Sequence, residues 1–323
     1  MLFGSYTYIF RFFMELGTHL DLHHFTAKSI GKNNVSLRRP ESTRKTRKLC
    51  DWCPKRINDS KTLSNIILSL VFFRRNPHHA QTLVHNSVKS IWASNYNGAA
   101  PTKVIVHGWT GNGNSSINPL ITEAFLSVSE CNVIVVDWNS LASRCYTTAV
   151  LGVPDVGEYL GNFLIWLFDI AGGDWNELHL VGFSLGAHVV GNAGLSLADI
   201  ILHPGLDPAL PLWCKNPDRL GTDSAVYVEI IHTDGGVLGF MKPIGHPGCW
   251  CSICSHFRAP ELFASSVKNN HFVGHRCANL IAASIGYCHG EKLQMGNDDR
   301  NKRGLLRVRE LTHPDNRQLF IKK

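Results

Sequence analysis

Residues 178–191, LHLVGFSLGAHVVG, contain a serine flanked by glycines, Gly182-Phe183-Ser184-Leu185-Gly186. A serine hydroxyl attacks a carbonyl carbon once a neighbouring base takes its proton. An apolar strand-like run precedes Ser184 and a helix-like run follows it. The sequence therefore predicts a tight turn in which Gly182 and Gly186 let the strand and the helix approach closely. The helix N-terminus would point at the serine and stabilise developing negative charge, so Ser184 is the candidate nucleophile.

The elements that must position this serine follow a repeating pattern. Short apolar, β-branched runs occur at 103–106, 132–136, 179–181, 200–202 and 225–231, with helix-like segments at 115–129, 154–171 and 185–198. Strands of this kind alternating with helices indicate a mostly parallel sheet covered on both faces. We expect the helix at 154–171 to begin at Pro154 and to end before Gly172. The run 63–73 is too short to span a bilayer and is expected to form a buried strand.

A G-x-S-x-G turn between a strand and a helix is the nucleophile elbow of α/β-hydrolases. The predicted fold class is therefore α/β, with an α/β-hydrolase fold, a mostly parallel central sheet and helices on both faces. The same fold requires the chain order serine, acid, histidine.

Four further segments accompany the elbow. They are Val106–Thr110 (VHGWT), Val136–Trp138 (VDW), Gly205–Ala209 (GLDPA) and Cys254–Ala259 (CSHFRA). In this order, and together with GFSLGAH, they resemble the pancreatic-lipase family of secreted lipases. The similarity is greatest to its short members, the insect phospholipase A1-like and lipase-like proteins, and it covers about residues 50–310.

The resemblance implies a role for each matching residue. Ser184 would be the nucleophile, His256 the general base and Asp207 the acid that orients the imidazole. The backbone N–H groups of Trp109 and Leu185 would form the oxyanion hole. No cofactor and no metal ion is expected.

Three other residues could compete for these roles. We expect His107 to support the oxyanion loop and His188 to serve in packing. Asp223 could in principle be the acid, but its place before the run 225–231 favours a structural or turn role.

The ten cysteines favour a secreted, disulfide-bonded protein because their number is even and large for the chain. The sequons at Asn34, Asn58 and Asn114 are compatible with a secreted glycoprotein. The resemblance implies the pairs Cys249–Cys254 and Cys277–Cys288, and a pair of Cys53 or Cys50 with Cys131. Cys145 and Cys214 are a further possible pair. A zinc site of Cys249, Cys251, Cys254 and His256 and a redox role for Cys50 and Cys53 are the alternatives.

The net charge of +7 is unevenly distributed. Residues 1–60 hold eleven Lys and Arg against five Asp and Glu, and residues 61–290 hold twelve against fifteen. The basic excess therefore lies at the chain ends, and it gives no reason to expect a nucleic-acid partner. The basic, polar segment 36–48 is expected to be a solvated linker, with nuclear localisation or polyanion binding as the alternative. We predict an N-terminal extension at 1–49, partly disordered, and a lipase domain at 50–323.

The resemblance implies a secreted, extracellular carboxylester hydrolase that acts on lipid at a membrane or lipoprotein surface. Phospholipase A1-like activity is favoured because only four residues separate Cys249 from Cys254, where the family carries its lid. The alternatives are a triacylglycerol lipase and a non-catalytic lipid-binding or yolk-type relative. We expect no transmembrane segment, no C-terminal β-sandwich domain and no colipase. The connections from Ser184 to Asp207 and through 245–249 are shorter than in the family, which could displace Asp207 and His256.

Overall fold

The computed structural model describes residues 68–72, 76, 79–197, 202–240, 244–245, 248–250, 256–277, 287, 292–294, 296 and 318–321. The predicted extension at 1–49 lies outside these residues, so the division of the chain at residue 50 stays a prediction.

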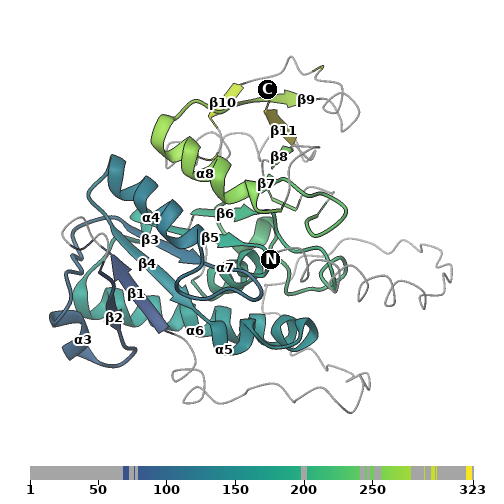
Figure 1. Cartoon of the computed structure of the whole chain (residues 1–323). Helices are drawn as coiled ribbons and strands as arrows, with labels where there is room; N and C mark the ends of the chain where they lie inside the picture. The colour runs from purple at the N-terminus through teal and green to yellow at the C-terminus, as the bar shows by residue number, and fades with distance from the viewer. Residues whose placement is uncertain are drawn as a thin grey trace, which may run out of the picture. The chain divides into compact units, whose positions relative to one another are not determined.

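An eight-stranded sheet with the order β2-β1-β4-β3-β5-β6-β7-β8 forms the centre of the described part (Figure 1). The strands are β1 (Leu68–Phe72), β2 (Gln81–Leu83), β3 (Thr102–Val106), β4 (Asn132–Asp137), β5 (Leu178–Phe183), β6 (Leu202–Leu206), β7 (Tyr227–His232) and β8 (Gly248–Trp250). Strands β3 to β8 pair in parallel, whereas β1 is antiparallel to both β2 and β4. This order of a mostly parallel sheet confirms the predicted α/β-hydrolase fold.

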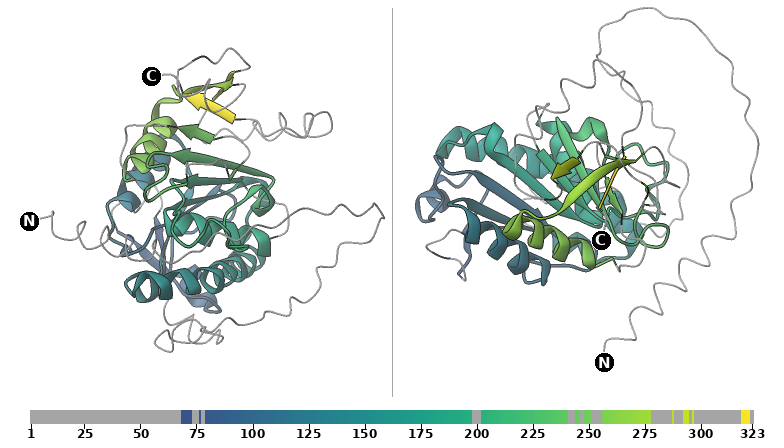
Figure 2. Two further views of the ribbon diagram at one scale, coloured as in Figure 1. Left: turned by 90° about the vertical axis from the view of Figure 1, so that its right-hand side faces the viewer. Right: turned by 90° about the horizontal axis from the view of Figure 1, so that it is seen from above.

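Helices cover both faces of this sheet. They are α3 (Val88–Trp92), α4 (Ile117–Val128), α5 (Asn139–Ala142), α6 (Tyr146–Ala171), α7 (Leu185–Ser196) and α8 (Arg258–Asn269), with short 3-10 turns η1 (Trp175–Glu177) and η2 (Thr222–Ser224). Helices α4 and α8 pack together on one face, and α6 and α7 pack together on the other (Figures 1 and 2).

The core beneath α4 and α8 follows the two-residue period of the strands. Ile105, Val133, Val135, Val181 and Phe183 are buried there with Phe125 of α4 and Phe263 of α8. The alternate residues of the same strands point to the opposite face, toward α6 and α7, and they are buried as well. The near-continuous apolar runs of the sequence reflect this burial on both faces.

Helix α6 begins at Tyr146, so the prediction that this helix begins at Pro154 was wrong. Pro154 lies inside the helix and cannot donate to the carbonyl of residue 150, a loss that costs about 3 kcal/mol or more in an isolated helix. The residues before it carry their own apolar stripe, with Tyr146, Ala149 and Val153 buried. Burial of this stripe offsets the missing bond, and the helix continues through the proline.

Strand β6 extends to Leu206, four residues beyond the predicted run at 200–202. Of that run, Leu202 is the residue that the structure describes. Pro204 and Gly205 lie within β6, where strand propensity is poor. Parallel neighbours β5 and β7 hold the strand on both sides, with Gly182 opposite Gly205 and Leu206 opposite Ile231.

A smaller sheet follows α8. Strand β9 (Val273–Cys277) pairs antiparallel with both β10 (Lys292–Gln294) and β11 (Gln318–Ile321). Among the described residues, no helix combines the length and the apolar character needed to cross a membrane.

Candidate active site

The turn at Ser184 joins the end of β5 to the start of α7. Ser184 has φ 56° and ψ −118°, a conformation that residues with a side chain rarely adopt. The glycines allow the close approach: a Cβ on Gly186 would lie 2.2 Å from the carbonyl oxygen of Val106, and one on Gly182 would lie 2.3 Å from that of Gly186. The predicted elbow is therefore present, and its serine side chain is almost fully buried.

Backbone hydrogen bonds fix this turn to the end of β6. The Ser184 N–H donates to the Leu206 carbonyl at 3.0 Å, and the Ser184 carbonyl accepts from the N–H of Ala209 at 3.3 Å. The backbone of Ser184 is thus bonded to a residue just before Asp207 and to one two residues after it. Asp207 itself follows β6.

Asp207 is fully buried and makes hydrogen bonds through both carboxylate oxygens. Its Oδ1 accepts from the Thr233 N–H at 2.9 Å, and its Oδ2 lies 2.7 Å from His256 Nδ1. Its own N–H donates to the Ile231 carbonyl at 2.7 Å, and its φ is 45°. The shorter connections on either side of this pair do not separate Asp207 from His256.

His256 lies in the turn that leads into α8 and is buried, with 7% of its surface exposed. Its carbonyl accepts from the Thr233 hydroxyl at 3.4 Å, and its ring lies 4.7 Å from that of Phe183, centroid to centroid. Because Nδ1 is engaged by Asp207, Nε2 is the ring nitrogen that can exchange a proton with a substrate or a hydroxyl.

The two predicted oxyanion donors belong to two segments that adjoin Ser184. Leu185 is the first residue of α7, where backbone N–H groups have no partner within the helix. Trp109 belongs to a loop that touches the serine, because a Cβ on Gly108 would lie 2.8 Å from Ser184 Cβ. The indole Nε1 of Trp109 donates to the Arg144 carbonyl at 2.8 Å, which fixes this loop to the segment before α6.

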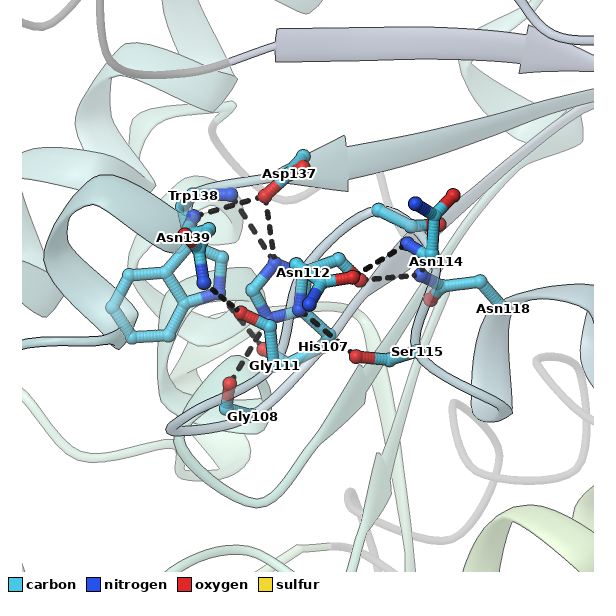
Figure 3. A network of polar contacts seen from close by, with 11 residues as sticks. His107, Gly108, Gly111, Asn112, Asn114, Ser115, Asn118, Asp137, Trp138 and Asn139 are labelled. Carbon is cyan, nitrogen blue, oxygen red and sulfur yellow. Dashed lines mark hydrogen bonds and ion pairs between the residues drawn. The ribbon is translucent and has the colours of Figure 1, made fainter.

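A polar network holds the oxyanion loop from behind (Figure 3). His107 Nδ1 donates to the Gly108 carbonyl at 2.9 Å, and His107 Nε2 lies 3.3 Å from Asp137 Oδ1. The indole of Trp138 stacks on His107 and donates to its carbonyl at 2.8 Å, and Asn139 donates to the Gly111 carbonyl at 2.8 Å.

The charge of Asp137 is stabilised within this network. Burial alone would raise the pKa of Asp137, but hydrogen bonds from His107 and from the backbone N–H of Asn139 hold it below its ordinary value. The contacts of His107 with Gly108, Asp137 and Trp138 are those expected for a residue that supports the loop.

His188 is buried in packing, as expected. Its Nε2 donates to the Ala209 carbonyl at 2.8 Å, its Nδ1 accepts from the Leu220 N–H at 3.0 Å, and its ring stacks on Trp213. Burial lowers the pKa of His188 to about 3. Burial likewise lowers the pKa of His232, at the end of β7, to about 4, against the opposing effect of the Asp207 charge.

Asp223, the alternative acid, lies in η2 before β7, which agrees with the expected place in a turn. The structure instead brings Asp234 to the predicted acid. One carboxylate oxygen each of Asp207 and Asp234 and one ring nitrogen of His256 all lie within 4.8 Å of one another. Asp234 was missed by sequence reasoning. Its position two residues after β7 could have indicated it, because neighbouring parallel strands bring their carboxyl ends together.

The structure describes only some of the ten cysteines. Each implied pair includes a cysteine outside the described residues, namely Cys50 or Cys53, Cys254 and Cys288, so these pairings stay predictions. The alternative zinc site also depends on Cys251 and Cys254, which lie outside them. Cys145 and Cys214 are exposed free thiols in the structure, so their possible pairing is not formed.

The mostly parallel sheet, the serine in the turn after β5 and the hydrogen-bonded histidine–aspartate pair place the protein in the class of α/β-hydrolase folds. A family model described as Lipase matches residues 30–320, and the chain therefore belongs to this family, the pancreatic-lipase family.

Its relatives carry lipase names. Lipoprotein lipase of Bos taurus is 31% identical over 247 residues, which cover 64% of this chain and 52% of that protein. Pancreatic lipase-related protein 2 of Myocastor coypus is 28% identical over 250 residues, which cover 65% and 53%. The chain thus spans about half the length of these relatives. A carboxylesterase structure from Bacillus cereus matches 53% of this chain and 76% of its own, at 16% identity and with a TM-score of 0.32.

Proposed function

We propose that the protein is a secreted serine carboxylester hydrolase that cleaves acyl esters of lipids, with phospholipase A1-like specificity. The observation that carries this proposal is the 2.7 Å contact between His256 Nδ1 and Asp207 Oδ2, next to a serine held in a strained elbow. Membership of the lipase family supports the class of substrate.

In the proposed mechanism, His256 Nε2 takes the Ser184 proton as Oγ forms a bond to the ester carbonyl carbon. The carbonyl oxygen becomes an oxyanion that accepts hydrogen bonds from the N–H groups of Trp109 and Leu185. The bond to the alcohol oxygen then breaks, and that oxygen takes the proton from His256. Water repeats the sequence on the acyl-enzyme and releases the fatty acid. Asp207 holds the imidazole in the tautomer that these steps need.

Exposed apolar side chains near the predicted acid and base favour a lipid substrate. Phe257, next to His256, is 48% exposed, and Val237, in the loop beside Asp207, is 52% exposed. Leu212, five residues after Asp207, is also exposed. Such side chains suit acyl chains presented at a lipid surface. The short segment between Cys249 and Cys254 favours phospholipid over triglyceride, by similarity to the short-lidded members of the family.

Secretion and glycosylation are part of the same proposal. Ten cysteines and three sequons support it, and Asn114, the sequon residue that the structure describes, is exposed. A shift in gel mobility on treatment with a glycosidase, smaller in Asn114→Gln than in the wild type, would test this site on secreted protein.

The test of the activity uses folded, disulfide-intact protein, its Ser184→Ala variant and a control, Ser143→Ala, which removes an exposed serine outside the site. Each is incubated with phosphatidylcholine labelled in the first acyl chain and with a triglyceride emulsion. We expect label to be released by the wild type and by Ser143→Ala, and not by Ser184→Ala.

Two other outcomes would overturn the proposal at different levels. Release from triglyceride alone would contradict the phospholipase A1 specificity but leave a serine lipase. Release from neither substrate would refute the hydrolase and favour a non-catalytic lipid-binding protein.

A further inference from the structure

A second carboxylate lies beside the histidine–aspartate pair. Asp234 follows β7 by two residues, and one of its carboxylate oxygens lies within 4.8 Å of both an Asp207 oxygen and a His256 ring nitrogen. Asp234 does not occupy the direct hydrogen-bonding position on His256, which belongs to Asp207. At this distance the charge of a carboxylate can reach an imidazole through space, without a hydrogen bond.

The Asp234 carboxylate is fixed by its own loop. Its Oδ2 accepts from the Leu238 N–H at 3.3 Å, and its carbonyl accepts from the N–H groups of Val237 and Gly239 at 3.3 and 3.1 Å. Gly239 in turn packs against the Asp207 carboxylate, because a Cβ there would lie 2.2 Å from Asp207 Oδ1. The loop 234–239 thus sets both carboxylates relative to the imidazole.

The charges around Asp234 are few. Burial raises the pKa of Asp234, and the negative charge of Asp207 raises it further, whereas the Leu238 N–H and the charge on His256 oppose this rise. His232, two residues earlier, is fully buried, and the low pKa that burial gives it keeps it neutral. His256 is therefore the group near Asp234 on which positive charge develops during the proposed reaction.

We propose that Asp234 is a positioning residue that acts through His256: its carboxylate stabilises the imidazolium form, and its loop holds Asp207 in place. This inference rests on the proposed function, because the imidazolium forms when His256 takes the Ser184 proton.

An opposite charge within about 4–6 Å shifts a titration by roughly one to three pH units, and the lower end applies to a half-buried carboxylate. Asp234→Asn keeps an oxygen that can accept from the Leu238 N–H but removes the charge. We expect the midpoint of the acid limb of kcat/KM to fall by about one pH unit, while the thermal midpoint stays the same. Asp234→Ala removes the acceptor as well, so it should show the same shift with a lower thermal midpoint.

The experiment measures kcat/KM on a soluble short-chain ester from pH 4 to 9 for wild type, Asp234→Asn, Asp234→Ala and a control, Asp169→Asn, which removes an exposed carboxylate on α6. An acid limb that moves in both Asp234 variants and not in the control supports the inference. An unchanged acid limb in Asp234→Asn overturns it and leaves the residue a purely structural role.

A second measurement separates this inference from the proposed function. The His256 ring is titrated by NMR in Ser184→Ala, with and without Asp234→Asn, and its signal is assigned by its loss in His256→Gln. A titration midpoint that falls by about one unit supports the effect of Asp234 even if the wild type releases no fatty acid. An unchanged midpoint in an active enzyme overturns the inference and leaves the proposed function intact.

Discussion

Gly239 provides a sensitive test of how the predicted acid is held. An alanine Cβ at this position would lie 2.2 Å from Asp207 Oδ1, 2.6 Å from Cγ and 2.7 Å from Oδ2. Ordinary contact begins near 3.4 Å, so the loop and the carboxylate must separate by about 1.2 Å. Gly239 is not among the residues with positive φ, so this contact is the main source of strain in Gly239→Ala.

Such a shift is longer than the two hydrogen bonds of Asp207 can absorb, because they are 2.7 and 2.9 Å long and a hydrogen bond is lost beyond about 3.5 Å. At least one of them is lost if the carboxylate moves. A misplacement of about 1 Å can cost on the order of a hundredfold in rate. We therefore expect kcat/KM on a soluble ester to fall about a hundredfold in Gly239→Ala, with a loss of stability of about 1–3 kcal/mol from overpacking.

The matched control is Gly152→Ala in α6, where the new Cβ meets only the flexible end of Leu141 at 3.1 Å. An alanine in a helix also limits the unfolded chain, so stability should stay equal or rise slightly. The assay measures kcat/KM and thermal unfolding of wild type, Gly239→Ala, Gly152→Ala and Asp207→Asn. A rate in folded Gly239→Ala within threefold of wild type would refute the reasoning that this contact sets the acid.

Three further predictions concern stability. Gly186→Ala places a Cβ 2.2 Å from the rigid carbonyl of Val106, so unfolding by denaturant should show a loss of about 3 kcal/mol, and an unchanged midpoint would contradict the close approach. Trp138→Phe removes the donor to the buried His107 carbonyl and should cost about 1–3 kcal/mol in the same assay, more than a phenylalanine at the exposed Trp92. Burial lowers the pKa of His188 to about 3, whereas an unfolded histidine titrates near 6.5, so the unfolded chain binds the extra proton. The stability from this histidine is complete above about pH 6.5 and is lost as the pH falls toward 3, by up to about 1.4 kcal/mol per pH unit. The variant His188→Gln should therefore show a smaller change of unfolding free energy with pH between 6.5 and 5.

Much of the central sheet could be predicted because its strands are apolar on both faces. The strands at 103–106, 132–136, 179–181 and 225–231 all appear with ends shifted by one or two residues in most cases. The failures fall where proline and glycine obscure the signal. Pro154 suggested a helix start, and Pro204 concealed a strand, because tertiary packing outweighs the local preference at both places.

The site likewise contains residues that the sequence predicts and residues that it does not. Ser184, Asp207 and His256 could be assigned because each lies in a short motif that matches a family pattern. Thr233, Asp234 and Gly239 carry no such motif in the sequence analysis, and they meet Asp207 only because β6 and β7 pair in parallel. Contacts of this kind depend on the register between strands, which a single sequence does not reveal.

The placement of the site across neighbouring strands has a consequence for folding. The serine follows β5, the acid follows β6, and the residue that bonds the acid follows β7, so three parallel strands must pair before the site exists. Pairing of strands distant along the chain is a slow part of folding, since long loops must close first. Recovery of the proposed esterase activity after dilution from denaturant would then report when the central sheet has formed. It should lag behind the return of helical circular dichroism.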